Sequence, residues 1–225
     1  MDGEAIGDQA PDQILRKGIT QVPQSHALFP AMSVLENVLM GGYLIRKDRR
    51  LLRERLDQVK QRLPIVAERA RDHAGNLSGG QRRMVEIARC LMLDPRLILL
   101  DEPSLGLDPR GLAGVAEVIH ELNRSGATVL LVEQNVRLGL GLATHGVVME
   151  GGKVRLTGTA AAVRDNPEIA SLYLGGTPMK ATPESRAPES RASEDRAPEN
   201  RGGSPWTSES PPPSRTGRPG SPPTG

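Results

Sequence analysis

The sequence predicts an α/β fold in which helices surround a mostly parallel sheet. Two observations carry this prediction. Continuously apolar runs that suit buried strands, at residues 97–100 and 128–132, alternate with segments whose apolar residues recur at helical spacing. Strand and helix signals follow one another along residues 14–176, and this order is typical of parallel strands joined by helical crossovers.

The helices are predicted from their starts and their apolar stripes. Ser33 with Glu36, and Ser78 with Gln81, have the spacing of capping boxes, so a helix is expected to begin at each serine. Three apolar stripes at helical spacing are Leu52, Leu56, Val59 and Leu63 before Pro64; Met84, Ile87, Ala88 and Leu91; and Leu112, Val115, Ile119 and Leu122 before Gly126.

The strands are predicted from short apolar runs. Residues 18–22 suit a short strand that ends at Pro23, and residues 96–100 and 128–132 suit strands covered on both faces. The pair Gly151-Gly152 lies between residues 146–150 and 153–157, which predicts a hairpin.

Composition limits the classes of function. The formal net charge is +2 and aromatic residues make up 2% of the chain, which argues against a nucleic-acid partner. The single cysteine, Cys90, lies in a helical pattern and is expected to be a buried, unreactive thiol in a reducing compartment. The longest apolar runs are too short to cross a bilayer, and residues 1–10 lack the features of a signal peptide, so a cytoplasmic chain is expected.

The composition changes after residue 176. Residues 177–225 contain eleven of the nineteen prolines, and a five-residue repeat of Arg-Ala-Pro/Ser-Glu starts at Arg186, Arg191 and Arg196. Because such a segment has too little apolar surface to offset its ordering entropy, it is expected to be a disordered tail.

The segment Leu77-Ser78-Gly79-Gly80-Gln81 opens a predicted helix. Two adjacent glycines let a ligand approach the backbone, and the first-turn N–H groups together with the helix dipole attract an anion. The segment therefore suits a phosphate site, although a serine N-cap after a glycine turn would use the same residues for structure alone.

An acidic pair follows the next predicted strand. Asp101 and Glu102 lie at its carboxyl end, where α/β sheets place their ligands. Asp101 suits Mg²⁺, which takes few carboxylates and keeps waters. Glu102 suits the orientation or deprotonation of an attacking water. Their position some twenty residues after a glycine-rich anion site favours this chemistry over a simple helix cap.

In these residues and in the motifs that follow, the chain resembles the nucleotide-binding domain of ABC transporters. Residues 77–81 match the signature motif, residues 97–102 the Walker B strand with its catalytic glutamate, residues 104–109 the D-loop and residues 22–24 the Q-loop. Residues 99–107 and 130–135 are similar to the second ATPase subunit of high-affinity branched-chain amino-acid importers.

The resemblance implies ATP and Mg²⁺ as cofactors and a role for each matching residue. Glu102 and Gln134 would be catalytic, and Asp101 and Gln24 would bind Mg²⁺. Gln134 stands where the family usually has histidine, and glutamine cannot accept a proton. The implied nucleotide-binding residues are Leu77, Ser78, Gly79, Gly80, Gln81, Gln24 and Asp108.

One family motif does not occur in the 225 residues. There is no G-x-x-x-x-G-K-[ST] loop, which in this family anchors the β- and γ-phosphates. The resemblance therefore predicts an ABC-type P-loop NTPase nucleotide-binding domain that lacks its N-terminal third and is inactive by itself. Residues 1–176 would form this partial domain, with a helical subdomain at about 33–90.

Two functions stay open from the sequence. The chain is either a truncated ATP-hydrolysing subunit that powers an importer, or a half-site donor that supplies only residues 78–81 to a partner ATPase. Either function implies a second ABC ATPase subunit, permease subunits and a peripheral position at the inner face of the membrane. A DNA-repair ATPase of the same superfamily is disfavoured, because the chain has no heptad run and a balanced charge.

Overall fold

The computed structural model describes residues 3, 5–25 and 27–169, and the expected tail, 177–225, lies outside them. The strands are β1 (Ile19–Val22), β2 (Leu97–Asp101), β3 (Thr128–Val132), β4 (His145–Glu150) and β5 (Lys153–Thr159). The helices are α1 (Pro11–Arg16), α2 (Val34–Gly41), α3 (Arg49–Arg62), α4 (Ile65–Glu68), α5 (Gly79–Leu91), α6 (Pro109–Arg124), α7 (Val136–Leu142) and α8 (Ala160–Arg164), with 3-10 turns η1 (Tyr43–Ile45) and η2 (Ala74–Asn76).

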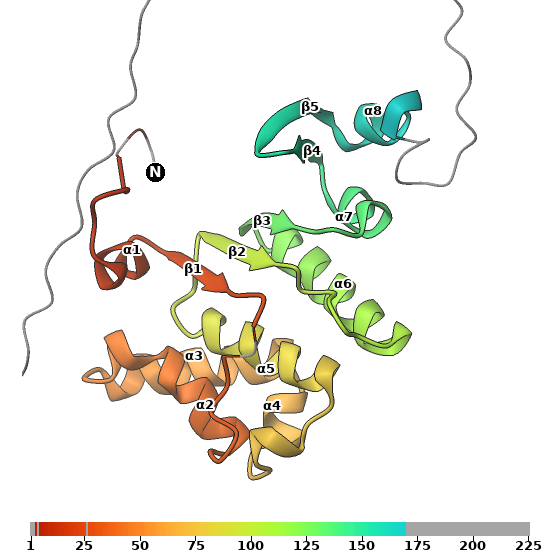
Figure 1. Ribbon diagram of the computed structural model, residues 1–225. Helices are drawn as coiled ribbons and strands as arrows, with labels where there is room; N and C mark the ends of the chain where they lie inside the picture. Colours follow the sequence, from red (N-terminus) through yellow and green to blue (C-terminus); the bar gives the residue numbers. More distant parts are fainter. Residues whose placement is uncertain (1–2, 4, 26, 170–225) are drawn as a thin grey trace, which may run out of the picture. The chain divides into compact units, whose positions relative to one another are not determined.

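Strands β1, β2 and β3 form a parallel sheet in that order, which confirms the parallel sheet expected from the sequence (Figure 1). Val22 lies opposite Leu100, and Asp101 lies opposite Val132. Because parallel strands end at the same edge, the connections that follow the three strands leave the sheet together. Four of the predicted site residues, Gln24, Asp101, Glu102 and Gln134, lie at or just beyond this edge.

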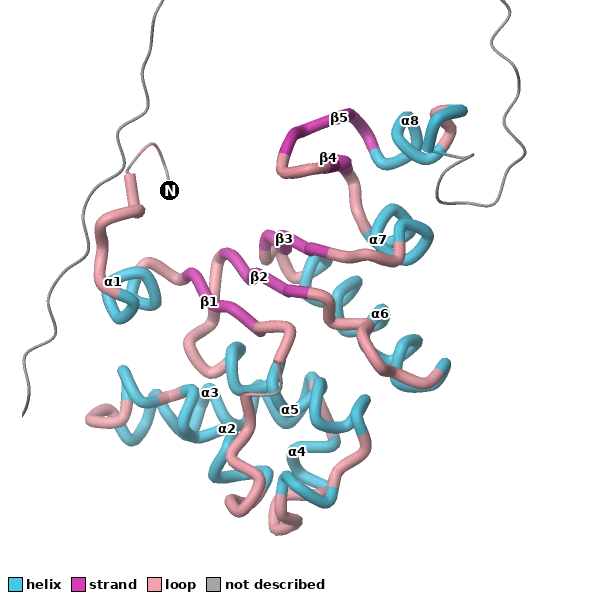
Figure 2. Tube along the Cα trace, in the orientation of Figure 1, coloured by secondary structure: helices cyan, strands magenta, loops and turns pink. Residues whose placement is uncertain are grey.

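Strands β4 and β5 form a separate antiparallel hairpin (Figure 2). Gly151 and Gly152 both have positive φ, 55° and 76°, which a two-residue hairpin turn of the primed type requires. The hairpin predicted from this glycine pair is therefore confirmed, although its strands run one residue earlier and two residues later than expected.

Helices α2 to α5 pack against one another below the sheet in Figure 1. Their starts follow the sequence signals, because both capping boxes are present: the Ser33 hydroxyl accepts from the Glu36 N–H, and the Ser78 hydroxyl accepts from the Gln81 N–H. The shorter helices α1, α4, α7 and α8 were not predicted, since helices of four to seven residues leave only weak periodic signals.

One core cluster runs from the sheet through helices α5 and α6 into helices α2, α3 and α4. The sheet contributes Val22, Ile98 and Leu100 to it. The helical side is made by buried apolar residues on or next to α2 to α6, namely Val34, Val38, Val59, Leu63, Val66, Val85, Ile87, Ala88, Leu91, Val115, Val118, Ile119 and Leu122.

The expectation that both central strands are covered on both faces was wrong. In β2, Ile98 and Leu100 are buried, whereas Leu97 and Leu99 on the other face are half-buried. In β3, Leu130 and Val132 are 55% and 54% exposed. A continuous apolar run looks the same in both cases: a strand covered on both faces, and a strand that helices of its own chain cover on one face only.

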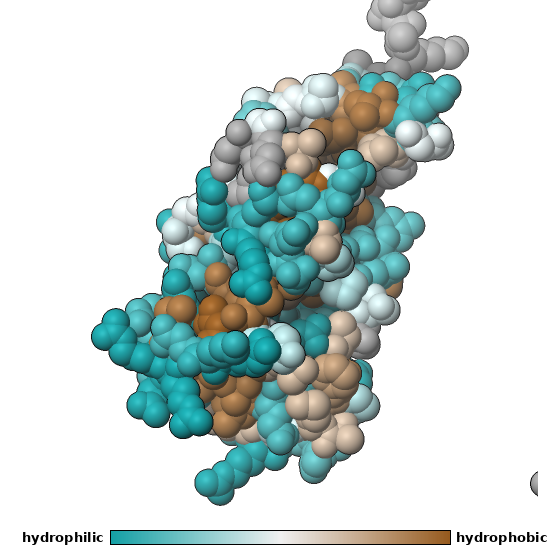
Figure 3. All heavy atoms as spheres, turned by 90° about the vertical axis from the view of Figure 1, so that its left-hand side faces the viewer, coloured by the Kyte–Doolittle hydropathy of each residue, from teal (hydrophilic) through white to brown (hydrophobic). Residues whose placement is uncertain are grey.

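The surface has further apolar side chains away from the sheet. Phe29, Met40 and Tyr43, on or near α2, are large and exposed. Figure 3 shows apolar side chains both in the lower half of that view and near its top, bordered by hydrophilic ones. Within the described ranges, no helix is both long enough and apolar enough to cross a bilayer.

The reactivity of the Cys90 thiol reports on the packing of α5 against β1. The thiol lies 3.4 Å from the Gln21 carbonyl oxygen, and the residue is half-buried where a fully buried one was expected. Loss of water around the sulfur raises the pKa of the thiol to about 11, from an ordinary 9.0. Since the thiolate is the reactive form, the folded protein should be alkylated at pH 8 about 100-fold more slowly than the urea-unfolded chain, which carries the same single cysteine.

The measurement is the rate of iodoacetamide labelling by mass spectrometry. Labelling of the folded protein should accelerate as the pH rises towards 11, and stability should fall between pH 9 and 11, because the unfolded chain releases the thiol proton first. Equal labelling rates for the folded and unfolded chains would show that the thiol is not buried.

Candidate functional site

Gln24 and Glu102, which are 78 residues apart in sequence, meet beyond the carboxyl edge of the sheet. The Gln24 amide donates a hydrogen bond from Nε2 to Oε2 of Glu102, at 2.8 Å. Gln24 follows β1 and Glu102 follows β2, so the parallel pairing of these strands brings the two side chains together. The sequence predicted a role for each residue but not this direct contact.

Glu102 has an unusual backbone conformation. Its φ is +44°, in the left-handed region that residues other than glycine and asparagine rarely adopt. The Glu102 N–H donates to the Val132 carbonyl oxygen at 2.8 Å, which stabilises the turn against β3. Such backbone strain persists where the surroundings impose it, and it often accompanies functional residues.

An open pocket of about 370 Å³ lies beside Glu102. Gln134 lines this pocket, so the structure brings together Glu102 and Gln134, the two residues expected to be catalytic. The full lining is Glu102, Ser104, Leu105, Gly106, Glu133, Gln134 and Asn135. The pocket is therefore built from the segments that follow β2 and β3.

Glu133 is a site residue that sequence reasoning missed. Its carboxylate accepts two hydrogen bonds from Ser104, one from the backbone N–H at 3.0 Å and one from the hydroxyl at 2.8 Å. This bidentate contact joins the segment after β3 to the loop after β2. The available signal was its place directly after β3, one strand over from Glu102.

The predicted phosphate segment is the start of α5. Ser78 is the N-cap: the Gln81 N–H donates to its hydroxyl at 3.3 Å, and the Ser78 N–H donates to Oε1 of Gln81 at 3.0 Å. Leu77 is buried just before it. The structural use of Ser78 and Gln81 as a capping box is thus present, and their contact with a nucleotide stays a prediction.

The two glycines of this segment differ in their surroundings. A Cβ on Gly80 would lie 2.9 Å from Cα of Gly111 in α6, whereas a Cβ on Gly79 would meet its nearest atom, in Leu107, at 3.6 Å. Gly80 therefore permits close packing of α5 on α6, a use that the sequence did not indicate. Asp108, expected to contact nucleotide, is the N-cap of α6 and accepts from the Gly111 N–H at 2.7 Å.

The loop between β2 and α6 links the start of α5 to the pocket. Gly106 lines the pocket, and its carbonyl oxygen and the neighbouring Leu107 lie nearest to Gly79. The start of α5 and the Glu102 pocket thus both border this short loop.

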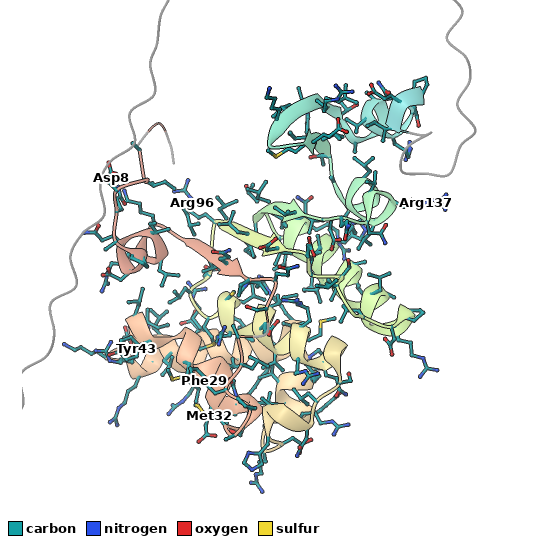
Figure 4. All side chains as sticks on the ribbon, viewed as in Figure 1. Asp8, Phe29, Met32, Tyr43, Arg96 and Arg137 are labelled. Atoms are coloured by element: carbon teal, nitrogen blue, oxygen red, sulfur yellow. The ribbon has the colours of Figure 1, made fainter. Side chains whose placement is uncertain are left out.

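The connection from β1 to α2 carries Gln24 and is anchored to α5. Arg83 donates to the carbonyl oxygens of Pro23 and Gln24, at 2.9 and 3.2 Å. The Ala27 N–H donates to Glu86 at 3.0 Å. Further along, the Asn37 side chain bonds both the N–H and the carbonyl of Phe29, which Figure 4 labels beside α2.

Asp101 is half-buried at the end of β2. Its carboxylate makes no hydrogen bond or ion pair with any residue in the described part of the chain, and the same holds for the amide oxygen of Gln24. Among the described residues, no three His, Cys, Asp or Glu side chains gather as a metal site would require. This donor set suits a cation that takes most of its ligands from water and phosphate.

Comparison with known proteins assigns the family. A model of the ABC transporter family matches residues 1–105. The chain is 41% identical over 175 residues to the high-affinity branched-chain amino acid transport ATP-binding protein BraG of Pseudomonas aeruginosa, with 78% of this chain and 74% of BraG covered. The chain belongs to the ABC transporter ATP-binding protein family.

Other relatives and a solved structure agree with this family. The lipopolysaccharide export ATP-binding protein LptB of Haemophilus influenzae is 36% identical, with 78% of this chain and 73% of LptB covered. The ATP-binding cassette MJ1267 in its ADP conformation has a TM-score of 0.66 at 27% identity, with 77% of this chain and 74% of MJ1267 covered. The expected ABC fold is therefore confirmed.

The contrast between Gly80 and Gly79 gives a prediction. Gly80→Ala places a methyl group against the α6 backbone, so it should destabilise the protein by about 1–3 kcal/mol and lower Tm by several degrees. Gly79→Ala is the matched control: it has room for the methyl group and should leave Tm unchanged or slightly raised. Calorimetric melting curves make the comparison, and equal Tm values for the two variants would contradict the packing role of Gly80.

Proposed function

We propose that this chain is the ATP-binding and ATP-hydrolysing subunit of an ABC importer for branched-chain amino acids. The family supports ATP binding, and the amino-acid importer is favoured because identity to BraG, 41%, exceeds identity to the lipopolysaccharide exporter LptB, 36%. The observation that carries the hydrolytic function is the contact of Gln24 with Glu102 beside a pocket that Gln134 also lines.

Mg²⁺ and ATP are proposed as the cofactors. Asp101 would hold Mg²⁺ together with the amide oxygen of Gln24. Neither the Asp101 carboxylate nor that amide oxygen has a hydrogen-bond partner among the described residues, and Mg²⁺ takes few protein oxygens. When bound, Mg²⁺ would neutralise charge on the phosphates. The start of α5, from Leu77 to Gln81, and Asp108 would face nucleotide beside the 104–107 loop.

Glu102 is proposed to orient the attacking water and to accept a proton from it. Glu102 lines the open pocket, and Gln24 donates to Oε2 of its carboxylate, whereas Oε1 has no hydrogen-bond partner among the described residues. Gln134 lines the same pocket and can donate or accept hydrogen bonds, but it cannot act as a base at neutral pH. The proton therefore goes to Glu102.

The proposed partners are a second ABC ATPase subunit and permease subunits. Relatives such as LivG of Escherichia coli, 34% identical with 72% of this chain and 70% of LivG covered, are named as transport ATP-binding proteins. Attachment to permease subunits would place the chain at the inner face of the membrane. The exposed side chains of Phe29, Met40 and Tyr43 offer apolar surface for such a contact.

The test is ATP hydrolysis by the assembled transporter. Glu102→Gln keeps the size of the side chain and removes its charge, so turnover should fall about 100-fold or more while ATP binding persists. Glu117→Gln, the same change at an exposed position on α6, is the control and should leave turnover unchanged. Phosphate release and ATP titration give the two quantities.

The half-site donor is the second candidate, in which the chain supplies its complete signature segment, residues 77–81, to a partner ATPase. Under this alternative, the chain contributes Ser78 to a site whose other residues belong to the partner. Ser78→Arg would then abolish turnover, while Glu102→Gln would retain more than about a tenth of it. That result would remove Glu102 from the mechanism.

A further inference from the structure

The middle of α5 holds a buried ion pair that the proposed reaction does not use. Arg83 Nη1 lies 2.9 Å from Oε2 of Glu86, and both side chains are 1% exposed. Burying two charges is costly unless each charge is paired and hydrogen-bonded. The remaining hydrogen-bonding groups of the two side chains therefore need partners as well.

Most of those groups contact the backbone around Gln24, whereas Arg83 Nε is buried without a hydrogen-bond partner among the described residues. Arg83 donates through Nη1 to the Pro23 carbonyl and through Nη2 to the Gln24 carbonyl, and Oε1 of Glu86 accepts from the Ala27 N–H. One turn further along α5, Arg89 Nη1 donates to the Ala27 carbonyl at 2.6 Å. The connection after β1 is thus bonded on both sides of Gln24 by side chains of one helix.

We propose that Arg83 and Glu86 are positioning residues that hold the backbone of Pro23, Gln24 and Ala27 so that the Gln24 amide reaches Glu102. The guanidinium suits this task because two nitrogens held in one plane bond these acceptors at separate points, Nη1 with Glu86 and Pro23 and Nη2 with Gln24, whereas an ammonium presents all its donors from a single nitrogen. The pair thereby ties the orientation of Glu102 to the helix that begins at Ser78. Only its consequence for ATP hydrolysis rests on the proposed function.

The main variant replaces the pair by apolar residues of similar volume, Arg83→Met with Glu86→Leu. Such replacements of buried ion pairs are often neutral or stabilising, so the fold should persist. The matched control is Arg69→Met with Asp72→Leu, a pair with the same three-residue spacing whose side chains are 49% and 42% exposed. Melting curves of both variants establish that the folds are comparable.

Two readouts report the position of Gln24 without any turnover. Hydrogen exchange of the Ala27 amide should accelerate about tenfold or more in the main variant, because its acceptor is gone, and should not change in the control. The side-chain amide resonance of Gln24 should shift towards its position in Glu102→Gln, which alters the same hydrogen bond at its acceptor.

Conservative single variants separate the two members of the pair. Arg83→Lys keeps the charge but has one donor nitrogen in place of Nη1 and Nη2, so it cannot reproduce both contacts in the same geometry; the Gln24 resonance should move while the Ala27 amide stays protected. Glu86→Gln keeps an acceptor oxygen for the Ala27 N–H and should retain most of that protection. These variants also decide the matter if the apolar double variant does not fold.

In the assembled transporter, the main variant should lower kcat for ATP about tenfold and leave KM within about twofold, because misplaced groups slow the reaction more than binding. Unchanged Ala27 exchange and an unchanged Gln24 resonance in a folded Arg83→Met/Glu86→Leu protein would overturn the proposal. If the unmodified transporter does not hydrolyse ATP, the proposed function fails, and the exchange and resonance data still decide whether the pair positions Gln24.

Discussion

The buried ion pair of Arg83 and Glu86 is the interaction on which the arrangement of the site depends. Parallel pairing of β1 with β2 brings their carboxyl ends to one edge, but it does not decide where the chain goes after Pro23. The pair supplies the hydrogen bonds that direct this connection along α5. Gln24 can reach Glu102 because its backbone is held on a helix that is itself buried in the core.

Helix α5 also positions the loop on the other side of Glu102. The absence of a side chain at Gly80 allows the start of α5 to lie against Gly111 at the start of α6. Since α6 begins at its N-cap Asp108, only a short loop separates this packed point from the end of β2. Glu133, in the segment after β3, accepts two hydrogen bonds from Ser104 in that loop. The loop is therefore held both by α6 and by the segment after β3.

The left-handed backbone at Glu102 fits this arrangement. A chain that continued β2 in extended form would carry Glu102 away from the turn that the Val132 carbonyl stabilises. The conformational cost is met by the contacts on both sides: β3 at the backbone and Gln24 at the side chain. Strain at this residue is therefore a consequence of where the neighbouring segments lie.

The sequence by itself determined the elements whose signals are local. Capping boxes at Ser33 and Ser78, the glycine pair of the hairpin and the apolar stripe of α6 all act between residues close in the chain, so their patterns predicted structure correctly. Only the tertiary structure decided the contact of Gln24 with Glu102, the role of Glu133, the packing use of Gly80 and the open face of β3, because each depends on residues far apart in sequence that no local pattern brings together.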